Sequence, residues 1–162
     1  MNGIDALDLF NVRRLSPILT TSGQPDEAAF AAMAADGVAT VINLALGDSP
    51  RALPDEGATL AALGIDYVHI PVAFDSPGEA AFAAFVEAYE AARDRPLHVH
   101  CVANYRVSAF FYRYRRDRLG WDEAAARRDL DAVWSPDPVW WAFIGDPVRD
   151  APRLAASEAR WP

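Results

Sequence analysis

Short apolar runs alternate with helical patterns along the chain. Residues 38–44 form a run rich in apolar and β-branched side chains that predicts a buried strand, and shorter runs at 67–70 and 97–100 predict two more. The stretch 10–22, interrupted by Pro17, predicts two short strands before the turn Ser22-Gly23-Gln24-Pro25. Short strands separated by helical patterns are typical of βαβ units.

Helical patterns fill the intervals between these strands. The clearest is at 79–93, where Phe82, Phe85, Val86 and Tyr89 recur at i, i+3, i+4 and i+7 on one face. Glycines suited to ending a helix follow several of these patterns. The predicted helices cover residues 26–36, 55–63, 79–93, 107–119, 122–133 and 138–145, and the stopping glycines are Gly37, Gly64 and Gly120.

This alternation predicts one α/β domain over residues 1–162, with a central, mostly parallel sheet flanked by helices and with extra C-terminal helices. A chain of 162 residues is long enough to bury a continuous core and too short for two comfortable domains. In sheets of this kind, ligands bind beyond the carboxyl ends of the strands. Cys101 directly follows the predicted strand 97–100, so it falls at such an end.

The charge of the chain narrows the choice of partners. The formal net charge is −8, and all 15 basic residues are arginines. Nucleic acid and anionic membranes are therefore not expected as partners. The start of the chain, Met1 to Asp5, lacks a basic segment followed by an apolar stretch, and no run approaches the roughly 18–20 apolar residues of a membrane span. A cytoplasmic protein is expected.

The loop Cys101-Val102-Ala103-Asn104-Tyr105-Arg106 is the best candidate for chemistry. A loop from a strand into a helix points backbone N–H groups inward, and the helix N-terminus adds partial positive charge. This setting favours a bound anion, and a thiolate over a thiol. Arg106 is the obvious cation, because its planar fork can hold two phosphate oxygens. Asn104 suits a left-handed position in the loop, and Ser108 is placed to cap the helix or donate to the thiolate.

Several segments together resemble bacterial protein tyrosine and dual-specificity phosphatases. These are His100-Cys101 through Arg106-Val107-Ser108, preceded by Ser22-Gly23-Gln24-Pro25, Val41-Ile42-Asn43-Leu44 and His69-Ile70-Pro71-Val72, and the resemblance spans residues 19–144. It implies a phosphatase-like fold in which Cys101 attacks phosphorus, Arg106 binds the phosphoryl oxygens and Asp75 protonates the leaving group. The implied phosphate-binding positions are Val102, Ala103, Asn104, Tyr105, Arg106 and Val107.

The resemblance also assigns supporting residues and a ligand. His100 matches the histidine before the cysteine in this family, and Ser108 matches the serine or threonine after the loop. No metal or organic cofactor is implied. The implied partner is a phosphorylated protein or a small phosphate ester.

The loop departs from the family's pattern in its length. The family's signature is H-C-x5-R-[S/T], whereas here four residues separate Cys101 from Arg106 and Val107 stands at the position expected for arginine. Loops of the form C-x4-R resemble those of rhodanese-like sulfurtransferases, in which the cysteine carries a sulfur atom. Three hypotheses remain open: a phosphatase acting through a phosphocysteine, a sulfurtransferase or persulfide carrier, and a catalytically silent oxyanion-binding module.

Other chemically capable side chains are predicted to be structural. His98 and His100 face the same side of one strand and His69 lies on another, without carboxylates at a suitable spacing, so no metal site is expected. The arginines between positions 113 and 118 are predicted to form a solvated face against neighbouring acids. The last helices are predicted to be packed by Trp134, Trp140, Trp141, Phe143 and Ile144.

Overall fold

A five-stranded, mostly parallel sheet forms the centre of the protein. The computed structural model describes Ile4 and residues 7–145. The strands lie in the order β1-β2-β5-β3-β4. A hairpin of β1 (Arg13–Ser16) and β2 (Leu19–Ser22) is antiparallel, whereas β2, β5 (Leu97–His100), β3 (Thr40–Asn43) and β4 (Asp66–His69) run parallel. The chain leaving the carboxyl end of β5 therefore emerges at the middle of the sheet.

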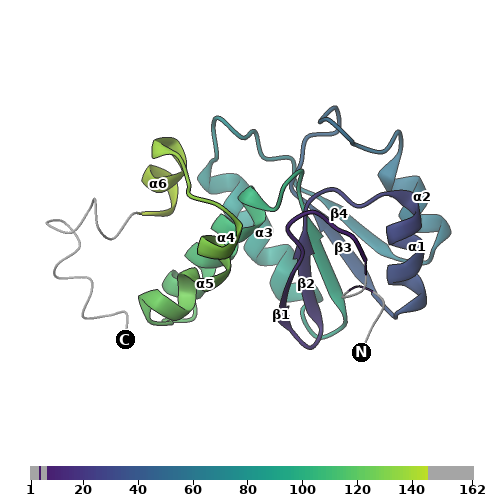
Figure 1. Ribbon diagram of the computed structural model, residues 1–162, viewed down its shortest axis with the longest axis horizontal. Coiled ribbons are helices and arrows are strands. Elements are labelled where there is room, and N and C mark those ends of the chain that lie inside the picture. Colours follow the sequence, from purple (N-terminus) through teal and green to yellow (C-terminus); the bar gives the residue numbers. More distant parts are fainter. Residues whose placement is uncertain (1–3, 5–6, 146–162) are drawn as a thin grey trace, which may run out of the picture.

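Helices cover both faces of the sheet (Figure 1). On one face lie α1 (Glu27–Ala35) and α2 (Glu56–Ala62). On the other lie α3 (Glu79–Ala92) and α4 (Tyr105–Asp117). Two further helices, α5 (Glu123–Val133) and α6 (Pro138–Ile144), pack against α4. The predicted α/β class, with extra helices at the C-terminal side, is confirmed.

The core consists of two clusters of side chains, because alternate residues of each strand face opposite sides of the sheet. Successive side chains of a strand point to opposite faces. Val99 and Cys101 belong to the cluster that packs against α3 and α4. His100, between them, faces α1 and lies with its ring centroid 5.8 Å from that of Phe30. The cysteine and the histidine before it therefore serve opposite sides of the sheet.

The elements follow the predicted order, with one shift that bears on the site. Helix α4 was expected from residue 107 and begins at Tyr105, so Tyr105 and Arg106 belong to its first turn rather than to the loop. Gly37, Gly64 and Gly120 follow α1, α2 and α4 with positive φ angles, as their stopping role requires. No helix in residues 7–145 is long and apolar enough to cross a membrane. The ends of the predicted domain, 1–3, 5–6 and 146–162, lie outside the described residues.

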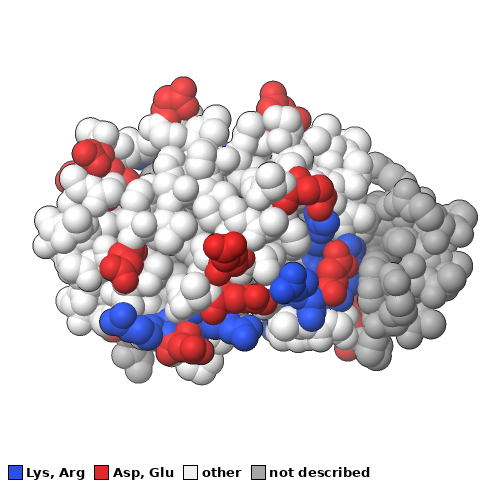
Figure 2. All heavy atoms as spheres, turned by 180° about the vertical axis from the view of Figure 1, so that it is seen from behind, with Lys and Arg blue, Asp and Glu red and all other residues white. Residues whose placement is uncertain are grey.

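The arginines of α4 differ from the predicted solvated face. Arg115 and Arg116 are buried, each 4% exposed, although the predicted pairing with acids is correct. On the face seen in Figure 2, arginines and carboxylates lie side by side. The pairs are Arg113 with Glu79, Arg115 with Asp129, Arg116 with Asp117, and Arg118 with Glu90. The aromatic residues interleaved with these arginines leave little of the helix to solvent.

A buried carboxylate joins three elements of the fold. Asp129 of α5 accepts hydrogen bonds from Arg115 of α4 at 2.7 Å and from Arg13 of β1 at 2.8 Å. Burial alone would raise the pKa of Asp129, but the two guanidinium groups outweigh it and hold the pKa below its ordinary value. The ionised carboxylate therefore ties the first strand to the last helices.

We expect Asp129→Asn to destabilise the protein by about 3–5 kcal/mol at pH 7, because it leaves the charge of buried Arg115 uncompensated. Because the pKa of Asp129 is lowered in the folded protein, its ionised carboxylate contributes its full stability above the ordinary pKa of about 4. This contribution is lost as the pH falls through the folded pKa. The stability difference from wild type should thus shrink below about pH 4. Urea unfolding of wild type and variant measures this difference. The control is Asp131→Asn, which removes an exposed ion pair with Arg127 on the same helix and should change stability by less than about 0.5 kcal/mol. Equal effects of the two variants at pH 7 would contradict the account.

Candidate active site

Cys101 is buried and lines an open hollow of about 340 Å³ beyond the carboxyl end of β5. Arg106 lines the same hollow, so the structure brings together the predicted nucleophile and the predicted cation. Apolar and aromatic side chains provide most of the walls. The lining residues are Leu46, Ser49, Pro50, Phe74, Cys101, Val102, Ala103, Tyr105 and Arg106.

The N-terminus of α4 carries no side-chain cap. Its N-cap residue, Asn104, has φ 69° and makes no capping hydrogen bond, so the predicted left-handed position is confirmed. By contrast, an aspartate carboxylate caps each of α1, α2, α5 and α6. The first turn of α4 also contains no acidic residue. The first amides of a helix have no acceptor within it, so this helix end can accept an external anion.

Contacts from the start of the chain hold the loop after β5 in place. Gln24 N–H donates to Val102 O at 3.0 Å, and a Cβ added at Gly23 would lie 2.5 Å from that same oxygen. Asn104 donates through Nδ2 to Thr21 Oγ1 and to Asn11 O, and Asn11 donates in return to Ala103 O. The Ser22-Gly23-Gln24-Pro25 segment thus supports the loop, and glycine is required because the two backbones meet there.

Arg106 is anchored but keeps donors for a ligand. Its Nη1 donates to Val72 O at 2.7 Å, and its guanidinium lies 5.8 Å from the centroid of the Phe74 ring. The residue is only 6% exposed, and its Nε is buried without a hydrogen-bond partner. A buried guanidinium nitrogen without an acceptor is unfavourable unless a ligand or water supplies one. The side chain is therefore poised for an oxyanion.

The helix register explains why Arg106 and Val107 have different environments. Neighbouring residues on a helix point about 100° apart. With α4 starting at Tyr105, Arg106 faces the hollow and Val107 is fully buried in the core. The Val107 side chain therefore lies in the apolar core, and only its backbone amide is available to an anion.

Ser108 does not cap α4. Its Oγ donates to Tyr105 O at 3.0 Å, within the first turn of α4, and Asn104 takes the N-cap position. The hydroxyl therefore donates within its own helix. A serine at the fourth helical position satisfies its hydroxyl locally in this way.

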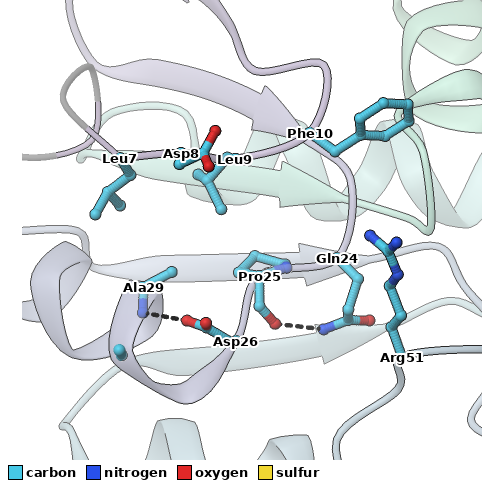
Figure 3. Close-up of a pocket in the computed structure, with 10 residues that line it drawn as sticks. Leu7, Asp8, Leu9, Phe10, Gln24, Pro25, Asp26, Ala29 and Arg51 are labelled. Carbon is cyan, nitrogen blue, oxygen red and sulfur yellow. Dashed lines mark hydrogen bonds between the residues drawn. The ribbon is translucent and has the colours of Figure 1, made fainter.

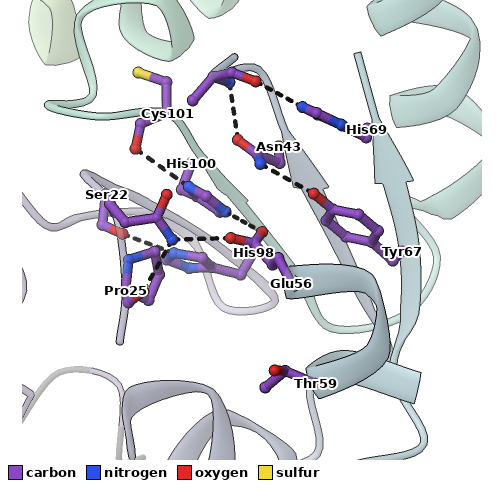
Figure 4. Close-up of polar contacts among 12 residues, drawn as sticks. Ser22, Pro25, Asn43, Glu56, Thr59, Tyr67, His69, His98, His100 and Cys101 are labelled. Atoms are coloured by element: carbon purple, nitrogen blue, oxygen red, sulfur yellow. Dashed lines mark hydrogen bonds and ion pairs between the residues drawn. The ribbon is translucent and has the colours of Figure 1, made fainter. Parts of the chain in front are cut away.

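His100 belongs to a buried network behind the cysteine (Figure 4). Its Nε2 lies 2.6 Å from Glu56 Oε2, and its Nδ1 lies 3.2 Å from the carbonyl oxygen of Cys101. Gln24 Nε2 donates to the other oxygen of Glu56. Burial alone would raise the pKa of Glu56, but the hydrogen bond and charge of His100 outweigh it and lower that pKa. Both ring nitrogens of His100 thus face acceptors, while the cysteine sulfur points away from the ring.

The other two histidines are hydrogen-bonded within the fold. Burial, and to a lesser extent the charge of His100, lower the pKa of His98 well below its ordinary value. The two ring nitrogens of His98 form hydrogen bonds with Thr20 Oγ1 and Ser22 Oγ. His69 Nε2 lies 2.6 Å from Ala45 O. Across residues 7–145 and Ile4, no group of three or more His, Cys, Asp and Glu side chains has a geometry that could hold a metal ion.

Asp75 lies on an exposed loop beside the hollow rather than among its lining residues. Its carboxylate accepts a hydrogen bond from Ser76 Oγ at 3.4 Å. The residues before it are firmly held, because Val72 O accepts from Arg106 and Phe74 O accepts from Trp140 Nε1 at 2.7 Å. Asp75 is thus one residue from an anchored wall of the hollow.

Two of the C-terminal tryptophans contact residues that line the hollow. Trp140 is fully buried, as the predicted packing role requires, and its indole N–H holds the loop at Phe74. Trp134 stacks on Tyr105, with ring centroids 4.5 Å apart and planes 3° from parallel. The cluster therefore connects the extra helices to the first turn of α4 and to the loop of Asp75.

Several supporting residues could not be identified from the sequence. Glu56 stands 44 positions before His100 and looks like any acid in a first helical turn. Asn11 lies 92 positions from the loop residue that it supports. Only the pairing of β2, β3 and β5 brings them close, and a single sequence carries no signal for such pairs.

Comparisons with known proteins decide the family. The sequence model of a family described as "DSP-PTPase phosphatase fused to NAD+ Kinase" matches residues 11–133. The chain belongs to this family. No protein with a curated description matches it. The predicted resemblance to tyrosine and dual-specificity phosphatases is therefore confirmed.

Solved structures agree with membership of this phosphatase family. A structure described as a phosphatase (DUF442) from Shewanella putrefaciens CN-32 is 31% identical, with TM-score 0.74, covering 93% of this chain and 95% of that one. A cysteine-to-serine variant of P. aeruginosa TpbA in complex with pTyr is 25% identical, with TM-score 0.67 and 91% of each chain covered. The core catalytic domain of S. cerevisiae SIW14, a PP-IP phosphatase, shares the fold at 14% identity, with TM-score 0.70, covering 96% and 97%. These findings support a phosphatase-type enzyme.

Proposed function

We propose that this protein is a cysteine-dependent phosphatase that hydrolyses phosphate monoesters through a phosphocysteine. The observation that carries the proposal is that Cys101 and Arg106, whose Nε has no hydrogen-bond partner, line one hollow at the uncapped N-terminus of α4. A thiol nucleophile beside oxyanion donors is the arrangement that phosphoryl transfer to cysteine requires.

In the first step, the Cys101 thiolate attacks phosphorus and forms the S–P bond. Arg106 and the amides of the first turn of α4 bind the equatorial oxygens, whose charge these donors stabilise. The P–O ester bond breaks, and the leaving oxygen takes the proton of the Asp75 carboxyl group.

In the second step, the Asp75 carboxylate takes a proton from water. The resulting hydroxide attacks phosphorus, the S–P bond breaks, and phosphate leaves with the thiolate of Cys101 restored. No metal or organic cofactor enters either step.

The network of His100 and Glu56 would position the nucleophile. The ring nitrogens of His100 lie within hydrogen-bond distance of Glu56 and of the Cys101 carbonyl, and these contacts would fix the backbone of the loop.

The walls of the hollow favour an ester with an aromatic or apolar group next to the phosphate. Leu46 and Phe74 are both 37% exposed there, so they can pack against such a group. The TpbA complex contains pTyr, which has this character. We therefore propose a phosphorylated protein or a small phosphate ester as the substrate, bound by one domain formed by residues 1–162.

Sulfur transfer is the second candidate, because the six-residue loop from Cys101 to Arg106 matches the C-x4-R length of rhodanese-like proteins. In that reaction Cys101 would carry a persulfide and Asp75 would have no role. Turnover of 4-nitrophenyl phosphate, compared with thiosulfate plus cyanide, separates the two. We expect phosphate release and no thiocyanate, and the reverse result would overturn the proposed function. Oxyanion binding without either reaction would indicate a silent module.

We expect Asp75→Asn to lower kcat for an alkyl phosphate by about 10²-fold and to affect 4-nitrophenyl phosphate much less. A poor leaving group needs the proton of the acid, whereas nitrophenolate leaves without it. Steady-state kinetics on both esters measure the difference, and Asp94→Asn, an exposed aspartate just before β5, is the matched control. Equal small effects on both esters would mean that Asp75 only shapes its loop.

A further inference from the structure

The hollow of Cys101 continues into two neighbouring hollows. One, of about 280 Å³, shares Pro50, Val102 and Ala103 with it. That hollow also shares Phe10 and Arg51 with a third of about 670 Å³, the one drawn in Figure 3. These three adjoining hollows, here called the groove, extend from the hollow lined by Cys101, past the loop after β5, to the hollow lined by the start of the chain. Phe10 and Arg51 stand where it widens.

Arg51 occupies a backbone position that disfavours it. Ala52 N–H donates to Ser49 O at 3.0 Å, closing a turn in which Pro50 is followed by Arg51 at φ 70°. Proline at the second position and positive φ at the third are features of a type II turn, whose third residue is usually glycine or asparagine. A long side chain is strained in this conformation, so its presence calls for a role of its own.

The charge of Arg51 is uncompensated within the described part of the chain. Its guanidinium is exposed and makes no hydrogen bond or ion pair with the described residues, although the protein carries 23 acidic side chains. Asp8 and Asp26 line the same large hollow, and Asp26 is engaged in capping α1. Within the groove, an anion is therefore favoured only at the end that holds Arg51. Phe10, which is 54% exposed, lies at the same end.

We propose that Arg51 binds a second negatively charged group of the substrate. The substrate class is then a phosphate monoester that carries a further carboxylate or phosphate, bound with its scissile phosphate over Cys101 and with the second anion at Arg51. Phe10 lies against the part of the molecule between the two. This inference rests on the proposed phosphatase activity and names Arg51 as the residue that selects substrates with a second anionic group.

Two matched pairs of esters test the inference and distinguish the two anions. The first pair is a phosphotyrosyl-glutamate peptide amide and its glutamine counterpart, which differ by one carboxylate. The second is adenosine 2′,5′-bisphosphate, assayed at its 2′ position, and adenosine 2′-monophosphate. We expect kcat/KM of wild type to favour the doubly anionic member of at least one pair by about three- to tenfold, the range of a single charged contact at a partly exposed site.

Arg51→Gln should bring that ratio close to one, and high salt should reduce it in wild type. The matched control is Arg95→Gln, which removes another exposed arginine. Arg95 lies before β5, at the opposite end of the strand from Cys101, so this variant should leave the ratio intact. Arg51→Gly should lower the ratio as Arg51→Gln does, without lowering the melting temperature, because glycine suits the turn.

A ratio near one in wild type for both pairs, or a preference that survives Arg51→Gln, would overturn the inference and leave the proposed function standing. Failure of wild type to hydrolyse any of the four esters, with 4-nitrophenyl phosphate also untouched, would contradict the proposed function and the second subsite with it.

Discussion

Replacing Cys101 with serine should lower kcat for phosphate monoesters by about 10⁴-fold or more. In the proposed mechanism the sulfur forms the covalent bond to phosphorus, and a serine hydroxyl at this place has no adjacent base to activate it. Losing a covalent nucleophile typically has effects of this size. Steady-state turnover of 4-nitrophenyl phosphate measures the loss.

Two controls make this result specific. Serine is close in size to cysteine and fits the same buried position, so the melting temperature should change by only a few degrees. Affinity for phosphate, measured by calorimetry, should also remain, because Arg106 and the amides of α4 still bind it. Activity within tenfold of wild type would reduce Cys101 to a small core residue and contradict the mechanism.

Arg106→Ala should lower kcat/KM by about 10³-fold. Removing one oxyanion donor costs other enzymes 10²–10³-fold, and arginines that stabilise phosphoryl transfer contribute at least about 10³-fold. Arg106 is also buried beside Cys101, where a charge acts more strongly than at the surface. Kinetics with an aryl phosphate test this expectation.

Arg106→Lys separates charge from shape. An ammonium keeps the charge but cannot present two parallel donors while also holding Val72 O, so phosphate affinity should still fall by about ten- to a hundredfold. The control is Arg113→Lys, which lies two helical turns further along α4 and pairs with Glu79 at the surface. Unchanged affinity in Arg106→Lys would leave the amides of α4 alone as the anion site.

The sequence sufficed for the fold because its signals are local. Phe82, Phe85 and Val86 recur at helical spacing and face the core, and the run at 38–44 contains the buried strand β3. The start of α4 was misplaced for an equally local reason. Asn104 takes the N-cap role through its backbone conformation, without the side-chain hydrogen bond that usually identifies a cap.

The candidate site could be located from the sequence but not completed. Cys101 and Arg106 are close in the chain, so their shared hollow follows from one loop and one helical turn. Glu56 and Asn11 support the loop from distant segments of the chain. Arg51 lines the groove from a turn whose sequence contains no known functional motif. Such contacts depend on sheet order, which hydrophobic periodicity does not specify.

The most direct test of the central claim is to trap the covalent intermediate. The protein would be mixed with an aryl phosphate, quenched in acid within milliseconds, digested and examined by mass spectrometry, using the Asp75→Asn variant to slow the second step. The chain has one cysteine, so the modified peptide is unambiguous. We predict a phosphoryl group on the peptide that holds Cys101, absent in Cys101→Ser. Phosphate release with the Cys101 peptide unmodified at every time point, or phosphoryl on another residue, would contradict the account.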